Sequence, residues 1–391
     1  MKVLIWMGGN FDRRTPSEHL FVAIVEALYN GGNTVHIIQK DTSGPLPKLP
    51  KELDKLGVTT DCIACKLAAK NNFIARYIVE LKYIWKSIKY IKKHKDCEAV
   101  FNQSSNVAGI MAFVIKHIMP KARLTYNVQD IFPENAFYIG SIKKIVYNIL
   151  SFQQKYAYHH SDQIITISED MKNLLIEKGA PSEKVEVVYN WSYSDELYQK
   201  ENMYNEEIAK YLSDDKFNVV YAGNIGTMQN VELLINTARI MQEESSIQFH
   251  IFGDGVFKQT LKQNAQDLSN VHFWPMQDAV LAPSIYSMAD VNIIPLAKNI
   301  YRTALPSKTA TCIACQQPIV FCIGKESKFG KKIIKQKGCY VIDSNNAEQL
   351  KNIILEIEKT PVCVDTTSIF KRDFQKSINS KKYSNLITEI K

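Results

Sequence analysis

Strand-like and helix-like patterns alternate along this chain in two separate runs, and this repetition strongly limits the folds it can adopt. The first run begins with "KVLIWMG" and ends with "VEVVYN", and the second begins with "FNVVYAGNIG". Alternation of this kind is typical of βαβ units, whose parallel sheet is covered by helices on both faces. We therefore predict an α/β protein with two parallel sheets of similar size.

The expected domain boundaries follow from the composition between the two runs. Residues 191–216 are dense in Ser, Tyr, Asp, Glu and Asn and are predicted to be a linker. This gives an amino-terminal domain at 1–190, a second domain at 217–365, and a helix at 366–391 that packs back on one of the lobes. Open α/β sheets bind ligands outside the carboxyl ends of their strands. We therefore expect a cleft between the lobes.

Positive charge is concentrated in the first half of the chain. Residues 1–190 contain 25 Lys and Arg against 18 Asp and Glu, out of a net charge of +8. Much of the excess lies in "RYIVELKYIWKSIKYIKKHK", where Tyr77, Leu81, Ile84, Ile88 and Ile91 recur at helical spacing. Such a helix either contacts an anionic membrane surface or packs its apolar face while its lysines stay solvated. Both interpretations stay open, and nucleic acid is not an expected partner.

The chain is expected to be cytoplasmic and peripheral to the cytoplasmic membrane face, because no segment resembles a membrane span or a signal peptide. Its eight cysteines are expected to be reduced thiols. The two "CIAC" runs, Cys62/Cys65 and Cys312/Cys315, have zinc-like spacing but lie about 250 residues apart. We therefore expect no metal site from them.

Glycine-containing loops follow several predicted strands. Gly9 ends the first strand before a helix predicted to begin at Pro16, and glycine there would allow backbone to approach a ligand closely. The pattern is not the G-x-G-x-x-G of a dinucleotide site. In the second domain, "YAGNIG", "IFGDG" and "FWPMQ" lie at one sheet edge and predict one ligand pocket. Its candidate residues are Asn224, Gly253, Asp254, Gly255, Pro275 and Met276, of which Asp254 could instead be a turn residue.

A lysine begins a predicted helix in "YRTALPSKTATCIACQQPIV". Pro306 would fix the approach, Ser307 would be the N-cap, and Lys308 would enter the first turn of a helix over Lys308–Cys315. The helix dipole and the ammonium both favour a phosphate, and Arg302 could supply a second cation. The alternative is a solvated lysine at a helix end.

The ordered motifs "YAGNIG…HIFGDG…FWP…ADVNIIPL…LPSKTATCIACQQPIV" resemble the nucleotide-sugar-binding domain of glycosyltransferase family 4. In the first lobe, "TYNVQDIFPENA", "DQIITISEDMK" and "VVYNW" resemble the acetamidosugar transferases of bacterial O-antigen and capsule synthesis. The resemblance implies a GT-B fold, in which two Rossmann-like domains face each other across a cleft. It also implies retaining transfer from a nucleotide-diphosphate sugar without a bound metal.

The resemblance also implies roles for individual residues. Lys308 and the amides around Ser307 match the diphosphate position, and the loops at Gly253–Gly255 and Phe273–Gln277 would flank the ribose and base. Asp130, at the end of a first-lobe strand, would orient or deprotonate the acceptor hydroxyl, with Glu134 as the second candidate. Either carboxylate could instead cap the short helix that follows.

Five positions depart from the family pattern. Thr303 and Thr311 stand where many members have glutamates, the second of which usually holds the ribose, so we include Thr311 among the donor-binding candidates. Thr227 and Met228 stand where a cation is common, and Gln316 replaces a usual glycine.

The favoured interpretation is a membrane-associated transferase. It would move an N-acetylated hexosamine or deoxyhexosamine from a UDP donor to a polyprenyl-diphosphate-linked acceptor, whose anionic lipid suits the basic first lobe. The alternatives are a UDP-sugar 2-epimerase of the same fold and a non-catalytic nucleotide-sugar-binding partner subunit.

Overall fold

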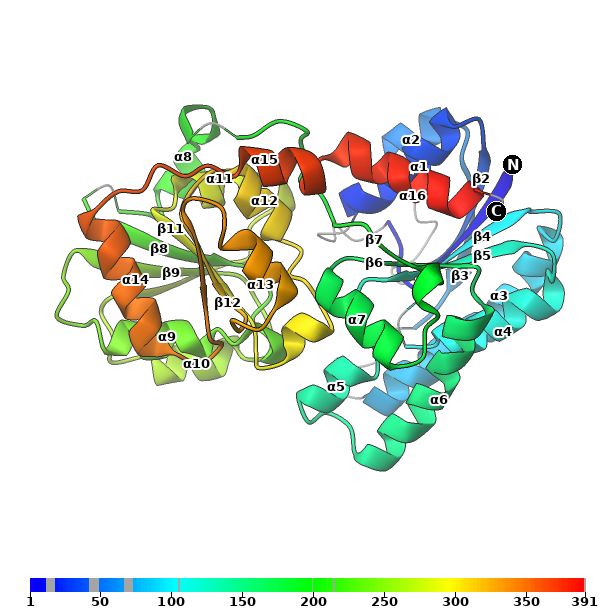
Figure 1. Cartoon of the computed structure of the whole chain (residues 1–391), viewed down its shortest axis with the longest axis horizontal. Helices are drawn as coiled ribbons and strands as arrows, with labels where there is room; N and C mark the ends of the chain where they lie inside the picture. Colours follow the sequence, from blue (N-terminus) through cyan, green and yellow to red (C-terminus); the bar gives the residue numbers. More distant parts are fainter. Residues whose placement is uncertain are drawn as a thin grey trace. The chain divides into compact units, whose positions relative to one another are not determined.

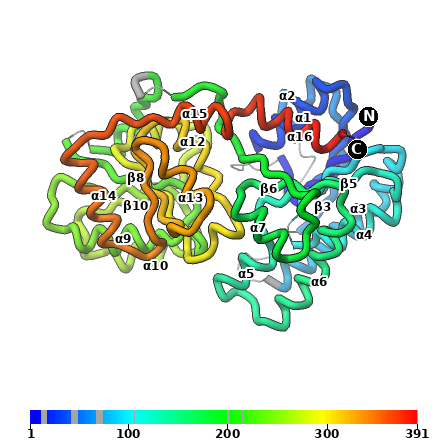
Figure 2. Tube along the Cα trace, in the orientation of Figure 1, coloured from blue at the N-terminus to red at the C-terminus, as the bar shows by residue number. Residues whose placement is uncertain are grey.

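The computed structural model describes residues 1–11, 18–41, 49–66, 73–104, 106–198, 200–213 and 215–389. The chain divides into two compact units (Figures 1 and 2). The first contains Met1–Asn190 together with Lys376–Lys391, and the second contains Trp191–Gln375. The predicted helix start at Pro16 lies outside the described residues.

The first unit is built on a parallel sheet with the strand order β3-β2-β1-β4-β5-β6-β7. Its central strands are buried along almost their whole length, as expected for a sheet covered on both faces. The strands are β1 (Lys2–Met7), β2 (Thr34–Asp41), β3 (Thr59–Ala64), β4 (Ala99–Gln103), β5 (Arg123–Val128), β6 (Gln163–Thr166) and β7 (Val185–Val187).

Helices follow most of these strands and cover the sheet. They are α1 (Glu18–Asn30), α2 (Lys51–Lys55), α3 (Phe73–Lys93), α4 (Ala108–Ile118), α5 (Glu134–Tyr138), α6 (Lys144–His160), α7 (Glu169–Glu177) and α16 (Lys376–Thr388), with a short 3-10 helix at Ser182–Lys184. In the described residues, no helix combines the length and apolar character needed to cross a membrane.

The second unit repeats this architecture with the strand order β10-β9-β8-β11-β12-β13. The strands are β8 (Phe217–Ala222), β9 (Ile247–Phe252), β10 (Val271–Trp274), β11 (Val291–Pro295), β12 (Ile319–Cys322) and β13 (Cys339–Ile342). The α-helices are α8 (Glu206–Ala209), α9 (Glu232–Arg239), α10 (Lys258–Asn264), α11 (Ala282–Met288), α12 (Thr309–Ala314), α13 (Lys328–Ile333), α14 (Ala347–Lys359) and α15 (Thr367–Ile369).

Each sheet reverses its strand order at one point, between β1 and β4 in the first unit and between β8 and β11 in the second. At such a switch point the connections diverge to opposite faces and leave a crevice at the carboxyl ends of the strands, where ligands of open α/β sheets bind. Gly9 follows β1 and Asn224 follows β8, so both candidate residues lie at a switch point.

Two segments join the units, and both contain helices in the described residues. The residues predicted as a linker include a 3-10 helix at Lys200–Met203 and the short helix α8. Trp191 and Ile208 of this segment are buried, so it packs within the second unit. The carboxyl-terminal region is divided: α15 and a π-helical turn at Phe370–Phe374 belong to the second unit, and α16 belongs to the first.

Helix α16 completes the core of the first unit. It packs against α1, and the buried Tyr383 hydroxyl donates a hydrogen bond to Asn127 Oδ1 at 3.1 Å. Arg123 of β5 donates to the Leu386 carbonyl, with a distance of 3.2 Å from Nη2. The last helix of the chain is therefore held by the sheet of the first unit.

Candidate functional site

The glycines at the strand ends of the second unit bring its loops together. Gly223, Gly253 and Gly255 have φ values of +148°, +148° and +158°, in a region that side chains disfavour. A Cβ atom on Gly253 would lie 1.9 Å from the Gly223 carbonyl oxygen, and one on Gly255 would lie 2.3 Å from the Ile225 oxygen. The neighbouring loops therefore leave no room for a side chain at residues 253 and 255.

Gly223 instead makes room for Lys308. A Cβ atom on Gly223 would lie 2.8 Å from the Lys308 ammonium nitrogen. That nitrogen lies 3.6 Å from the centroid of the Tyr221 ring, in a cation–π contact, and the Tyr221 hydroxyl donates to the Asn224 carbonyl at 2.5 Å. The two motifs "YAGNIG" and "PSK" therefore form one structural site.

The Lys308 ammonium has no hydrogen-bonding or ion-pair partner among the residues that the structure describes. Its burial lowers the pKa of Lys308 from the ordinary lysine value to about 7. A buried cation without a counter-ion is costly, and an anion placed beside it would remove that cost and raise the pKa again. A negatively charged group next to Lys308 would therefore be stabilised.

The helix after Lys308 differs from the prediction. Lys308 itself occupies the N-cap position of α12, no side chain caps that helix, and Ser307 is exposed, so the prediction of Ser307 as N-cap is wrong. The chain turns because the Thr309 amide donates to the Pro306 carbonyl at 3.0 Å. Since α12 has only six residues, its dipole is a smaller contribution than the lysine charge.

The other donor-side candidates fall into two groups. Asn224, Asp254, Pro275 and Met276 are exposed on the loops after β8, β9 and β10. Thr311, by contrast, is only 4% exposed within α12, and the Thr303 hydroxyl is buried and donates to the Ile300 carbonyl at 3.0 Å. The two threonines at the family's glutamate positions therefore present little polar surface.

The remaining positive candidate, Arg302, lies in a 3-10 helix at Ile300–Arg302, six residues before Lys308.

A second lysine in this region, Lys258, was not predicted from the sequence. Lys258 donates to the carbonyls of Gly253 at 2.6 Å and Trp274 at 2.9 Å, which ties the loops after β9 and β10 together. Burial and neighbouring Lys262 lower its pKa. The sequence feature that could have indicated this role is a lysine at the start of a predicted helix, five residues after Gly253.

Asp130 follows β5 at the carboxyl edge of the first sheet, as predicted. Burial raises the pKa of its carboxyl group from the ordinary value to about 7. A carboxylate whose pKa is close to neutral can accept a proton from a hydroxyl group and release it again. The pKa of Asp130 therefore lies in the range expected of a general base.

Glu134 has a different environment. It is 2% exposed, accepts a hydrogen bond from the Tyr147 hydroxyl at 3.1 Å, and pairs with Lys178 at 3.2 Å. These contacts fix the carboxylate within the first unit. The N-cap of α5 is Pro133 without a side-chain cap, so neither Asp130 nor Glu134 caps that helix.

Gly9 has open space where a Cβ atom would stand, and its carbonyl accepts a hydrogen bond from the Lys40 amide at 3.1 Å. The local packing therefore does not require glycine there.

In the second unit, His250 and His272 lie in strands and stack on each other with 5.2 Å between ring centroids. Burial and neighbouring His272 lower the pKa of His250 to about 3, which is unsuited to proton transfer near neutral pH.

Comparison with known structures defines the class of protein. The chain aligns over its whole length with the crystal structure of Anabaena HepE in complex with UDP and glucose, with a TM-score of 0.71, 13% identity and complete coverage of both chains. It also aligns with the lipopolysaccharide glycosyltransferase WaaG with a TM-score of 0.64 and 14% identity. The protein has the GT-B fold.

Sequence comparison assigns the family. Residues 17–191 match glycosyltransferase family 4, and residues 216–359 match the glycosyl transferases of group 1. Pseudomonas aeruginosa WbjE, named as a glycosyltransferase, is 21% identical over 338 residues, which is 84% of each chain. Escherichia coli WcaI, named as a colanic acid biosynthesis glycosyl transferase, is 32% identical over 163 residues, or 40% of this chain and 39% of WcaI. The protein is a glycosyltransferase of family 4.

Proposed function

We propose that this enzyme transfers a sugar from a UDP-sugar to a polyprenyl-diphosphate-linked acceptor during capsule, O-antigen or exopolysaccharide synthesis. The complex of HepE with UDP and the assignment of WcaI to colanic acid synthesis support the donor and the pathway class. The sugar is an N-acetylated hexosamine or a deoxyhexosamine, as the first-lobe motifs "TYNVQDIFPENA" and "VVYNW" suggest.

The half-buried Lys308, whose ammonium has no hydrogen-bonding or ion-pair partner among the described residues, is the observation that carries the proposal. A leaving UDP develops negative charge on its diphosphate, and a preorganised cation stabilises that charge as the glycosidic bond breaks. Lys308 supplies this cation, and Asn224 and the loops at residues 253–255 and 275–276 contact the nucleotide. The transfer needs no metal in this proposal.

Asp130 acts on the acceptor side. Its carboxylate takes the proton from the acceptor hydroxyl as the oxygen bonds to the anomeric carbon, on the same face as the departing UDP. The anomeric configuration is thereby retained. Glu134 is committed to Tyr147 and Lys178, so Asp130 is favoured for this role, and Gly9 offers an open surface for the acceptor.

The acceptor is placed at a membrane surface by the first unit. Helix α3 exposes an apolar stripe at the spacing i, i+4, i+7 and i+11, and α6 exposes a second, shorter stripe. The members are Ile74, Ile78, Leu81 and Trp85 on α3, and Ile145, Ile149 and Phe152 on α6. Lysines flank both stripes, so the surface combines apolar and basic groups, as peripheral membrane proteins do.

Substitution of Lys308 tests the function. Lys308→Met keeps most of the side-chain volume and removes the charge, and we expect transfer from a UDP-sugar panel to a membrane lipid extract to fall about 100-fold or more. The exposed Lys298, on the same unit, gives the matched control Lys298→Met, which should retain activity. Product mass and UDP release are measured together. Unchanged turnover in Lys308→Met would overturn the proposed donor site.

A further inference from the structure

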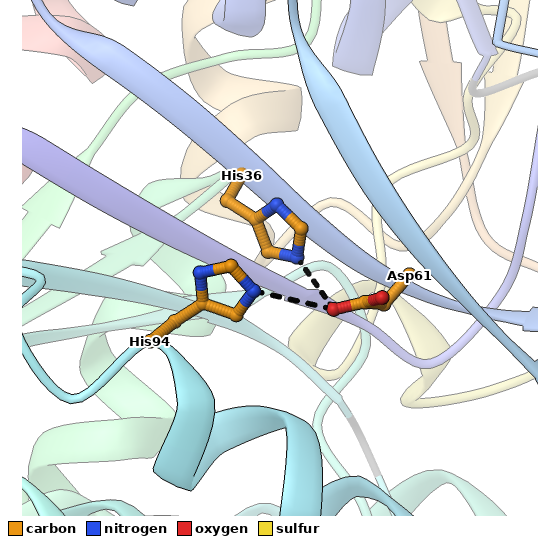
Figure 3. Close-up of side chains that lie close together, drawn as sticks. All are labelled: His36, Asp61 and His94. Carbon is orange, nitrogen blue, oxygen red and sulfur yellow. Dashed lines mark hydrogen bonds and ion pairs between the residues drawn. The ribbon is translucent and has the colours of Figure 1, made fainter.

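Two histidines and an aspartate converge in the first unit, away from the candidate site. His36 Nε2 lies 3.0 Å from Asp61 Oδ2, and His94 Nε2 lies 3.2 Å from the same oxygen. Figure 3 shows both imidazole rings directed at this carboxylate. The ligand atoms of the three residues all lie within 4.8 Å of one another, and among the described residues no other such group of three is found.

The topology of the sheet brings these residues together. His36 is the third residue of β2 and Asp61 the third of β3, and the parallel register pairs His36 with Thr59 and Ile38 with Asp61. Because side chains two residues apart share a face, His36 and Asp61 lie on one face of the sheet. Helix α3 contacts the same two strands, and His94 follows immediately after its last residue.

Two of the three separations between ligand atoms are close to those of a metal coordination shell. Zinc bonds imidazole nitrogen and carboxylate oxygen at about 2.0–2.2 Å, so two tetrahedral ligands stand about 3.3 Å apart. The distances from Asp61 Oδ2 to the two imidazole nitrogens, 3.0 and 3.2 Å, are close to this value. The rings stack with their centroids 3.6 Å apart, and both Nε2 atoms contact the same carboxylate oxygen.

The surroundings also suit a metal. His36 Nδ1 lies 2.7 Å from the Thr59 hydroxyl, which fixes the ring orientation as outer-shell partners of ligating histidines do. The side chains of Asp61 and His94 are 18% and 21% exposed, so an ion can enter and keep a water ligand. Two nitrogens and one oxygen favour a divalent transition metal over calcium or magnesium, which prefer oxygen alone.

We propose that His36, Asp61 and His94 bind a Zn²⁺ ion, with solvent at the fourth position. The ion joins the edge strand β3 and the end of α3 to β2. His36 and Asp61 are the third residues of β2 and β3, whereas Asp130 follows the carboxyl end of β5, so the ion is not at the strand ends where Asp130 lies. Its role is to hold these elements together, and it is independent of the proposed transfer reaction.

Metal titration of the whole protein tests the site. After treatment with a chelator and in a non-thiol reductant, Zn²⁺ binding is measured by calorimetry, and Co²⁺ binding by its visible absorption. We expect one tight site, and a rise in Tm when Zn²⁺ is added. Asp61→Asn and His94→Ala should each weaken binding at least about tenfold, the range seen when metal ligands or their supports are lost. His117→Ala, an exposed histidine on α4, should bind as the unaltered protein does.

The design separates a metal site from a hydrogen-bonded cluster. If the unaltered protein binds no Zn²⁺, or if Asp61→Asn and His94→Ala bind it as tightly as His117→Ala, the proposal is overturned and the three residues form hydrogen bonds only. Binding through the nearby thiols would give Co²⁺ a sulfur charge-transfer absorption and would also overturn it. Asp61→Asn preserves side-chain shape, and circular dichroism confirms that each variant is folded.

Discussion

The ammonium of Lys308 lies over the Tyr221 ring in a space that only glycine at position 223 leaves open. The sequence motif "PSK" predicted a cation at this position, but it predicted the wrong capping residue. The error has a physical reason: a serine that precedes a helix is a common N-cap, yet here the first turn closes through the Pro306 carbonyl. The partnership between Lys308 and Gly223 depends on contact between segments 85 residues apart, which no local pattern contains.

In the proposed mechanism, two groups set the pH dependence of transfer. Asp130 must be ionised to accept a proton, and its pKa is raised to about 7, so activity increases as the pH rises toward 7. Lys308 must be protonated to bind the diphosphate, and its pKa is lowered to about 7, so activity decreases as the pH rises further. We expect kcat/KM for the donor, which reports the free enzyme, to have a narrow maximum near pH 7.

Lys308→Arg isolates the alkaline limb of this profile, because a guanidinium group stays charged throughout the range. In this variant we expect kcat/KM to be lower but to remain level above about pH 7, while the acidic limb persists. Initial rates from about pH 5 to about pH 9 provide the measurement. An alkaline decrease that is unchanged in Lys308→Arg would show that another group is responsible.

Gln316, which replaces a glycine of the family pattern, has an unusual backbone conformation. The φ of Gln316 is +52°, a left-handed backbone conformation that glycine adopts freely and other residues disfavour. For a residue other than glycine, this conformation is unfavourable by about 1 kcal/mol. We expect Gln316→Gly to raise the free energy of unfolding by about 0.5–1 kcal/mol in urea titration, since the bond from Gln316 to Thr367 is long at 3.5 Å.

Gln317→Gly is the matched control for this substitution, because Gln317 does not have a positive φ. Glycine there adds freedom to the unfolded chain without relieving any strain, so the free energy of unfolding should decrease. Equal changes in the two variants would rule out backbone strain at residue 316.

At the scale of elements, helix α3 shows how far periodicity can be read. Apolar residues at helical spacing predicted one apolar face, either packed or in contact with a membrane surface, and Ile84 and Ile91 of that face are buried. Leu81, however, joins Ile74, Ile78 and Trp85 in a second stripe that faces outward. A helix of 21 residues with apolar positions on two faces can pack one face against a sheet and present the other to a membrane. Composition alone does not indicate which face has which contact.

Membrane binding by the two stripes is expected to depend on their large side chains. Trp85 on α3 is 74% exposed and Phe152 on α6 is 81% exposed. Burying one such side chain contributes about 1.5–3 kcal/mol, so Trp85→Glu and Phe152→Glu should each reduce vesicle binding about tenfold or more. The measurement is co-sedimentation with vesicles that contain anionic lipid.

The exposed Val256, on the second unit, provides the control Val256→Glu, which should bind vesicles normally. Transfer to a water-soluble acceptor should be unchanged in Trp85→Glu and Phe152→Glu, since neither residue belongs to the candidate site. If Trp85→Glu and Phe152→Glu bind vesicles as well as Val256→Glu does, the stripes are not the membrane surface.

At the scale of the whole molecule, alternation of patterns was sufficient to predict two α/β sheets, because each βαβ unit is specified by nearby residues. The positions of the segments that connect the units could not be predicted from local patterns in the same way. Burial of Trp191 and Ile208, and the position of α16 on the first sheet, depend on contacts across as many as 263 residues, as between Arg123 and Leu386. The His36, Asp61 and His94 cluster was missed for the same reason.

The place of α16 affects the order in which the protein can fold as it is synthesised. The ribosome makes the strands of the first unit before the second unit, but it makes α16 after both. During that interval the surface of α1 and the polar groups of Asn127 and Arg123 lack the helix that covers them in the finished protein. The second unit, made without interruption, can reach its final core earlier, so the half of the enzyme that is translated first is the half that matures last.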